Sequence, residues 1–177
     1  MWISLVGFMG AGKNRVAAEL GDRALLPVVD LDARVVELAG TPVSEIFASR
    51  GEPVFRRLET AALYALDRRR EQVVACGGGV VERPANVARL REAGVVIWLD
   101  AAWNEVRRRL EADPADRPLL RRLGWDGMER LFHRRRPAYA RAAHFRLRSD
   151  LETPALLAVQ SLRCRLALAR ERAEAKA

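Results

Sequence analysis

The sequence predicts an α/β domain in which a parallel sheet is covered by helices on both faces, giving three layers. Five short apolar runs alternate with longer segments of helical periodicity, the order expected of strands joined by crossover helices. The runs are nearly continuous in apolar residues, as strands buried on both faces of a parallel sheet should be. With 177 residues, no internal repeat and no long linker, the chain is expected to form one domain over 1–177.

The expected strands are the apolar runs at 3–6, 26–29, 72–76, 95–99 and 145–147. The helical patterns between and after them lie at 14–20, 33–39, 43–49, 53–70, 84–93, 102–111, 125–142 and 153–173. Two helices have clear start signals, because Pro84 and Pro154 stand at the first helical position and Thr153 is a suitable N-cap. Residues 113–123 are rich in Pro, Asp and Arg without periodicity, so no regular element is expected there.

Composition excludes several classes of protein. Half of the residues are hydrophobic, which is enough for a core, and no apolar run approaches the roughly 18–20 residues of a membrane span. The N-terminus lacks a basic segment and a cleavage site, so a cytoplasmic protein without membrane contact is expected. Cys76 and Cys164 lie far apart, which argues against a disulfide scaffold or a zinc site.

The net charge of +8 comes almost wholly from arginine, since Lys13 and Lys176 are the only lysines. Such a charge suggests an acidic partner, such as nucleic acid, an anionic membrane or phosphorylated small molecules. A compositional preference for arginine is the alternative explanation for most of these side chains.

The first run leads into a glycine-rich segment, GFMGAGK at 7–13, which fits the phosphate-loop pattern G-x-x-x-x-G-K. Glycines let the backbone wrap around phosphates, the following helix adds the positive end of its dipole, and the lysine supplies a point charge. A glycine turn with an incidental lysine is less probable, because the segment follows a strand and opens a helix. The residues expected to bind nucleotide phosphates are Gly10, Ala11, Gly12, Lys13, Asn14 and Arg15.

Asn14 stands where phosphate loops carry Ser or Thr, whose hydroxyl ligates Mg²⁺. An amide oxygen can coordinate a hard cation, but Asn is longer than Ser and Mg²⁺ requires tight octahedral geometry. Three interpretations stay open. Asn14 ligates the metal less directly or through water, other groups hold the metal, or the protein has lost much of its phosphotransfer activity.

Asp30 and Asp32 lie at the carboxyl end of the second run, where the ligand crevice of an open α/β sheet is found. One carboxylate could hold Mg²⁺ through water, and the other could accept hydrogen bonds or a proton from substrate hydroxyls. The alternative is that Asp32 merely caps the following helix.

Glycines and arginines form a second group of candidates. The triplet at 77–79 ends the third run and would let a ligand approach backbone N–H groups, although glycines also make ordinary turns. Arg56 and Glu59 share a helix face, while Arg117 and Arg135 lie in basic stretches further along the chain. Each could be a solvated surface charge, but arginine also offers a planar fork to carboxylates and phosphates.

In order and spacing, these segments resemble the shikimate kinase family over roughly residues 3–150. The motifs are GFMGAGK at 7–13, DLD at 30–32, IFASRGEPVFRRLE at 46–59, CGGGVV at 76–81, RPLL at 117–120 and RRPAY at 135–139. The resemblance implies a phosphate-loop fold like that of nucleoside monophosphate kinases, with strand order 2-3-1-4-5. It also implies a substrate-binding insertion at about 31–60, a lid at about 112–124 and a monomer.

The implied activity is transfer of the ATP γ-phosphate to the 3-hydroxyl of shikimate, in aromatic amino-acid biosynthesis. On this resemblance, Lys13 contacts the β- and γ-phosphates and Arg117 reaches them from the lid. Asp30 and Asn14 place Mg²⁺.

The resemblance assigns the remaining candidates to the substrate. Asp32 holds the ring hydroxyls and is the candidate base, so that Lys13, Asp32 and Arg117 are the catalytic candidates. Arg56 and Arg135 clamp the shikimate carboxylate, and Glu59 shapes the pocket behind Arg56. The residues whose backbone approaches the substrate are Gly78 and Gly79.

Three alternatives belong to other classes of function. Another small-molecule kinase of this fold, such as one acting on gluconate, would share the carboxylate and hydroxyl chemistry. A degenerate kinase would bind its ligands without turnover because of Asn14. Nucleic-acid binding is the least favoured, because the chain lacks a base-reading module and only 6% of its residues are aromatic.

Overall fold

The computed structural model describes residues 1–113 and 117–175 and confirms the predicted α/β architecture. Five parallel strands form one sheet in the order β2-β3-β1-β4-β5. The strands are β1 (Trp2–Val6), β2 (Val28–Asp30), β3 (Val73–Ala75), β4 (Gly94–Asp100) and β5 (Phe145–Arg148). The strand order implied by the family resemblance is therefore correct.

The central strand β1 explains why the apolar runs are continuous. All of its residues are buried, and its register places Ile3 beside Val73 on one side and Val95 on the other. These three side chains lie on one face of the sheet, whereas Trp2 and Val6 lie on the other. The three inner strands, β3, β1 and β4, thus feed two separate cores, one on each face.

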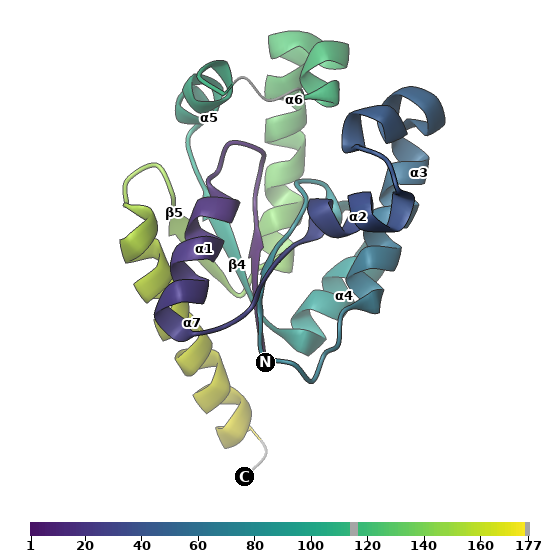
Figure 1. Ribbon diagram of the computed structural model, residues 1–177. Helices are drawn as coiled ribbons and strands as arrows, with labels where there is room; N and C mark the ends of the chain where they lie inside the picture. Colours follow the sequence, from purple (N-terminus) through teal and green to yellow (C-terminus); the bar gives the residue numbers. More distant parts are fainter. Residues whose placement is uncertain (114–116, 176–177) are drawn as a thin grey trace.

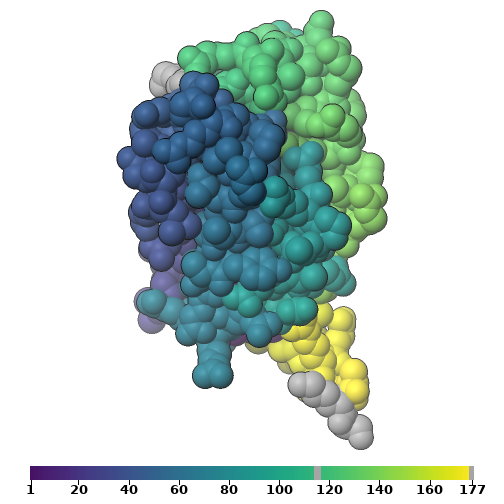
Figure 2. Space-filling model, turned by 90° about the vertical axis from the view of Figure 1, so that its right-hand side faces the viewer, coloured from purple at the N-terminus to yellow at the C-terminus, as the bar shows by residue number. Residues whose placement is uncertain are grey.

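Helices cover both faces of this sheet, as Figure 1 shows. The helices are α1 (Lys13–Ala24), α2 (Leu31–Ala39), α3 (Val43–Ala65), α4 (Pro84–Ala93), α5 (Trp103–Glu111), α6 (Pro118–Ala142) and α7 (Pro154–Glu174), with a 3-10 turn η1 (Val80–Glu82). One face packs against α1 and α7, and the other packs mainly against α3, α4 and α6. The C-terminal part of α7 projects beyond the body of the molecule in Figures 1 and 2.

Two long helices bend at glycines. The segments expected at 43–49 and 53–70 join as α3, which bends at Gly51 (φ 75°) and ends at Ala65, before a run of exposed arginines. The expectation that 113–123 lacks regular structure is wrong for its second half. There α6 begins at Pro118, and its first turns end at a bend at Gly124 (φ 64°). The piece between this proline and the bend is too short to show a period in sequence.

The bounds of α1 and β2 also differ from expectation. Gly21 does not end α1, because it gives room to Val28, whose Cγ2 would lie 2.3 Å from a Cβ added at that glycine. The helix instead continues to Ala24, and its C-cap is Leu25, whose backbone has the left-handed conformation. Strand β2 starts two residues later than predicted. It also ends one residue later, so that Asp30 is its last residue.

The described residues contain no helix that is both long and apolar enough to cross a bilayer. Of the lid expected at 112–124, residues 114–116 lie outside the described part of the chain.

Candidate active site

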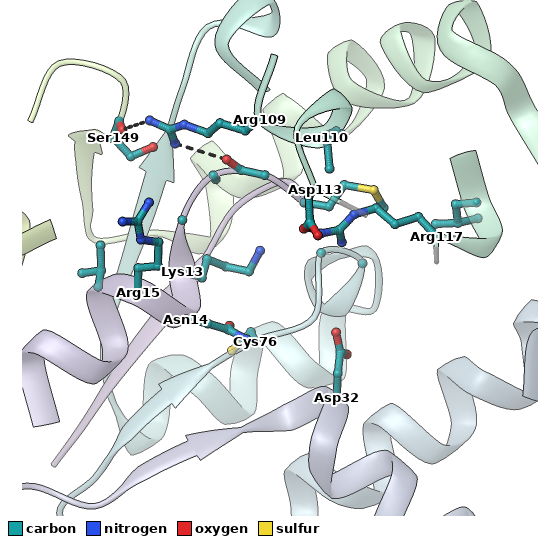
Figure 3. A pocket seen from close by; sticks show the side chains of 18 of the residues that line it. Lys13, Asn14, Arg15, Asp32, Cys76, Arg109, Leu110, Asp113, Arg117 and Ser149 are labelled. Atoms are coloured by element: carbon teal, nitrogen blue, oxygen red, sulfur yellow. Dashed lines mark hydrogen bonds and ion pairs between the residues drawn. The ribbon is translucent and has the colours of Figure 1, made fainter. Parts of the chain in front are cut away.

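A cleft of about 810 Å³ opens at the carboxyl ends of the strands, between the glycine loop, α2, α3 and the start of α6. Figure 3 shows Lys13, Asp32 and Arg117 reaching into it from three different elements. Almost all residues predicted from the sequence line this cleft: Gly10, Ala11, Gly12, Lys13, Asn14, Arg15, Asp30, Asp32, Arg56, Gly78, Gly79, Arg117 and Arg135. Glu59 lies behind the wall, fully buried against Arg56.

The glycine loop has the backbone that only glycine accepts readily. Gly7, Gly10 and Gly12 have φ values of 149°, 78° and 87°. A Cβ at Gly7 would lie 2.5 Å from the carbonyl oxygen of Leu99 on β4, so this glycine lets the loop pass close to the sheet. The loop then turns into α1, whose N-terminus faces the cleft.

Lys13 is folded back onto the loop that carries it. Its Nζ donates hydrogen bonds of 3.0 Å to the carbonyl oxygens of Gly7 and Phe8. Burial lowers the pKa of Lys13, although the nearby carboxylates Asp32 and Asp30 partly oppose the shift. An anionic ligand in the loop would restore the preference for the charged ammonium.

Asn14 and Asp30 contact each other directly. The Nδ2 of Asn14 donates to Oδ2 of Asp30 at 2.7 Å, while Oδ1 of Asp30 accepts from the backbone N–H groups of Asp32 and Ala33 at 2.9 and 3.4 Å. Asp30 is therefore the N-cap of α2, and the alternative that Asp32 caps this helix is wrong. The cap leaves Asp32 in the first turn of α2 with its side chain turned into the cleft.

These groups fit a magnesium ion that arrives with a nucleotide. The described residues include no cluster of three or more His, Cys, Asp or Glu side chains that could hold a metal alone. Mg²⁺ bound to nucleotides takes one or two carboxylates, phosphate oxygens and water, all of them hard oxygen ligands. Asp30, Asp32 and the amide oxygen of Asn14 supply that chemistry beside the phosphate loop.

Asp32 and Glu59 form a buried acidic pair around Gly77. Oδ1 of Asp32 and Oε1 of Glu59 are buried without a hydrogen-bond partner among the described residues. Burial raises the pKa of Asp32 more than the charge of Lys13 lowers it, and burial likewise raises the pKa of Glu59 despite its bond to Arg56. A Cβ at Gly77 would lie 2.3 Å from Glu59 Oε1 and 2.7 Å from Asp32 Oδ1, so this glycine makes room for both carboxylates.

Arg56 and Arg135 are both buried at the other side of the cleft. Arg56 donates to Glu59 at 2.9 Å and to Glu52 at 3.2 Å. Arg135 donates to Glu82 at 2.7 Å. In each arginine the Nε is buried with no partner within the described residues. The alternative that Arg56 and Glu59 form a surface ion pair is therefore wrong, because both side chains are buried. The guanidinium groups of Arg56 and Arg135 line one cleft, and each has an N–H donor that no described residue accepts.

Arg117 lies at the N-terminal end of α6 and pairs with Asp113 in the segment before it. Its side chain lines the cleft opposite the glycine loop (Figure 3). The position agrees with the expected approach of this arginine to bound phosphates.

Several cleft residues escaped sequence reasoning. Arg109 of α5 donates to the carbonyl oxygens of Gly10 at 3.2 Å and Ser149 at 2.7 Å, and so ties the phosphate loop to the segment after β5 (Figure 3). Glu52 could have been found, because it stands four residues before Arg56 on a helical pattern. Glu82 and Arg109 left no signal, because only the fold brings Arg109 to the cleft and Glu82 to Arg135.

Comparisons with known proteins agree on one family. A family model described as "Shikimate kinase" matches residues 9–165. A shikimate kinase of Synechococcus sp. (strain JA-3-3Ab) is 42% identical over 141 residues, covering 79% of this chain and 74% of the relative. One of Sulfurihydrogenibium sp. (strain YO3AOP1) is 36% identical over 160 residues, covering 90% and 95%. Among solved structures, shikimate kinase from Acinetobacter baumannii in complex with shikimate has a TM-score of 0.86 and 30% identity, covering 96% of this chain and 93% of that one.

Proposed function

The chain belongs to the shikimate kinase family, and we propose that it transfers the γ-phosphoryl group of ATP to the 3-hydroxyl of shikimate, giving shikimate 3-phosphate and ADP. One observation carries the proposal. A single cleft joins a phosphate loop to two buried arginines and to a buried carboxylate oxygen that has no hydrogen-bond partner among the described residues. These are the groups that a phosphate donor and a hydroxylated carboxylic acid would need.

The nucleotide binds in the glycine loop. Its phosphates accept hydrogen bonds from the loop N–H groups between Gly10 and Arg15, at the positive end of the α1 dipole. The ammonium group of Lys13 releases its hydrogen bonds to the carbonyl oxygens of Gly7 and Phe8 and donates to the β- and γ-phosphates instead. Arg117 approaches these phosphates from the opposite side of the cleft. Positive charge is thereby placed where negative charge builds up during phosphoryl transfer.

Shikimate binds on the other side of the cleft. Its carboxylate pairs with the buried guanidinium groups of Arg56 and Arg135, whose partners Glu59 and Glu82 hold them in place. Oδ1 of Asp32 accepts a hydrogen bond from the ring hydroxyl that is to react and takes its proton as the oxygen attacks phosphorus. Gly78 and Gly79 let the ring approach the backbone.

Asp30 and Asn14, beside the phosphate loop, would hold the Mg²⁺ that arrives with the nucleotide. When bound, the ion neutralises charge on the phosphates and so eases nucleophilic attack. Asp30 keeps its carboxylate pointed at the loop because Ala33, Asp32 and Asn14 donate to it. The contact between Asn14 and Asp30 supports the two interpretations in which Asn14 ligates the metal indirectly or other groups hold it. The third interpretation, a loss of phosphotransfer activity, is decided by measuring turnover.

The remaining features complete the proposal. The protein acts as a monomer in the cytoplasm, where ATP is available, and supplies shikimate 3-phosphate to aromatic amino-acid biosynthesis. Residues 31–60 form the substrate-binding insertion and residues 112–124 the lid. Nucleic acid is not a partner, because the charges that line the cleft suit small anions.

A coupled assay of ADP release tests this function. We expect release to require ATP, Mg²⁺ and shikimate together, with gluconate giving less than about 1% of the rate, because the chain matches the shikimate kinase family over most of its length. A higher rate with gluconate would favour the sugar-acid kinase alternative. Binding of ATP and shikimate without ADP release would favour a degenerate kinase.

A further inference from the structure

We propose that Tyr139 is a positioning residue that presents the backbone N–H of Gly79 to the substrate. The inference rests on the proposed function, because it concerns how the shikimate side of the cleft is held in shape. Tyr139 lies in α6, four residues after Arg135, so both side chains leave the same face of the helix. Arg135 forms part of the cleft wall, whereas the tyrosine ring is buried behind it.

The hydroxyl of Tyr139 donates a hydrogen bond to the carbonyl oxygen of Gly78 at 2.5 Å. The ring that carries this hydroxyl is fixed, because it stacks on Trp98 of β4 with 5.9 Å between centroids and an interplanar angle of 29°. A rigid donor supported by the sheet therefore sets the orientation of the peptide between Gly78 and Gly79.

The peptide between Gly78 and Gly79 is planar, so the direction of its C=O group fixes the direction of its N–H group. All described peptides are trans, so the C=O of Gly78 and the N–H of Gly79 point in opposite directions. With the carbonyl turned toward Tyr139, the N–H turns away from it. The next turn is anchored separately, since Val80 N donates to Gly77 O and Glu82 N donates to Gly79 O. No acceptor for the Gly79 N–H lies within the described part of the chain, and Gly79 lines the cleft.

The two substrate arginines flank this peptide. The guanidinium of Arg56 lies so close to Gly79 that an added Cβ would be 2.3 Å from its Cζ, and Nη1 of Arg135 lies 3.8 Å from an added Cβ at Gly78. An anionic group held by both arginines would lie beside the free N–H. The peptide thus supplies a third donor to the substrate, and Tyr139 aims it without touching the substrate.

The chain offers a matched control, because it has only two tyrosines. Tyr64 also donates its hydroxyl to a backbone carbonyl, that of Ala85 at 3.1 Å, but it is exposed and outside the cleft. We expect Tyr139→Phe to weaken shikimate binding by about three- to tenfold in calorimetry, the loss of one modest hydrogen bond. The affinity for ADP should stay within about twofold, and Tyr64→Phe should leave both affinities unchanged.

Equal shikimate affinity in Tyr139→Phe and Tyr64→Phe would overturn the proposal, as would an equal loss for shikimate and ADP in Tyr139→Phe. Failure of the unaltered protein to bind shikimate would instead contradict the proposed function. NMR spectra of glycine backbone amides distinguish a local change at Gly79 from a general loss of stability. The Gly79 amide should shift on addition of shikimate to Tyr64→Phe, and this shift should be reduced in Tyr139→Phe.

A second measurement covers the case in which Tyr139→Phe does not fold. In Tyr64→Phe, 3-fluorotyrosine would label position 139 alone while keeping its hydroxyl. We expect shikimate to move the single fluorine resonance, because a substrate bond at the Gly79 N–H strengthens Gly78 O as an acceptor. A resonance that shikimate leaves in place would overturn the proposal.

Discussion

Single residues in the cleft hold charges that their surroundings disfavour. Burial raises the pKa of Asp32 and lowers that of Lys13, so each side chain gives up some preference for its charged form. Perturbed groups of opposite sign in one cleft are typical of sites built for a charged ligand and for proton transfer. We expect bound ligands to supply the partners that these groups lack.

Asp32 should make the activity sensitive to mild acid. Since burial raises its pKa above the ordinary value near 4, the carboxylate becomes protonated, and unable to accept a proton, at a higher pH than a free aspartate. We expect kcat/KM, measured from pH 4.5 to 8, to fall on acidification with an apparent pKa above that of a free aspartate. Asp32→Asn should lose about 100-fold or more in kcat.

The same variant should be more stable than the unaltered protein at pH 7. A folded-state pKa above the unfolded one means that the folded state binds the proton more tightly, so the free energy of unfolding decreases as pH rises through the folded pKa. Removing the buried charge should raise Tm by roughly 2–4 °C at pH 7, with a smaller difference near pH 4. A lower Tm for Asp32→Asn at pH 7 would contradict this reading.

Arg56 and Arg135 should determine the binding of shikimate but not the binding of the nucleotide. Replacing either by Ala removes charged donors to the carboxylate, so the KM for shikimate should rise by at least about tenfold with the KM for ATP nearly unchanged. The neighbouring exposed arginines serve as controls, since Arg57→Ala and Arg134→Ala remove the same charge outside the cleft. Loss of nucleotide affinity in the first pair would mean that they contact the other ligand.

At the scale of elements, glycines place the helices around the cleft. Bends at Gly51 and Gly124 turn the first part of α3 and the first part of α6 toward each other. Figure 2 shows these two helices side by side at one end of the molecule. Glu52, next to the first bend, accepts from Arg122 of α6 at 2.7 Å and from Arg56 inside the cleft. Glu52 thus links Arg56 to α6, the helix whose N-cap is Arg117.

Gly77 offers a test of this placement. In Gly77→Ala the new methyl group would displace the carboxylates of Glu59 and Asp32, so the KM for shikimate should rise by about tenfold or more with nucleotide affinity retained. Gly40→Ala is the matched control, because Gly40 has φ 68° with no atom within 4 Å of an added Cβ. It should cost only about 1 kcal/mol of stability and leave kinetics unchanged. Equal kinetics in the two variants would contradict the account.

Sequence patterns predicted the order of elements better than their ends. All five strands and the sheet class followed from apolar runs, most clearly for β1, β3 and β4, whose residues are all buried. The end of α1 was missed because Gly21 looks like a stop, whereas its lack of a side chain admits Val28. The motif residues of the cleft could be predicted, but Glu82 and Arg109 could not, because their neighbours are set by chain folding alone.

Over the whole molecule, many arginines hold elements together. Asp100 at the end of β4 binds Arg136 of α6 and Arg146 of β5, and Arg136 lies over the rings of Trp98 and Phe132. Other arginines reach backbone carbonyls at helix ends, among them Arg89, Arg91 and Arg172. Several of the arginines behind the charge of +8 therefore join elements of the fold, many others are exposed, and a small number line the cleft.

The most direct test of the central claim is product formation by the unaltered chain and by Asn14→Ser at varied Mg²⁺. If the phosphates, Asp30 and Asn14 hold the ion as proposed, the unaltered protein should form shikimate 3-phosphate, which phosphorus NMR would detect. Asn14→Ser should gain less than about tenfold in rate and in apparent Mg²⁺ affinity. Binding of both ligands without product in the unaltered protein, together with turnover in Asn14→Ser, would contradict the claim that this chain is a working kinase.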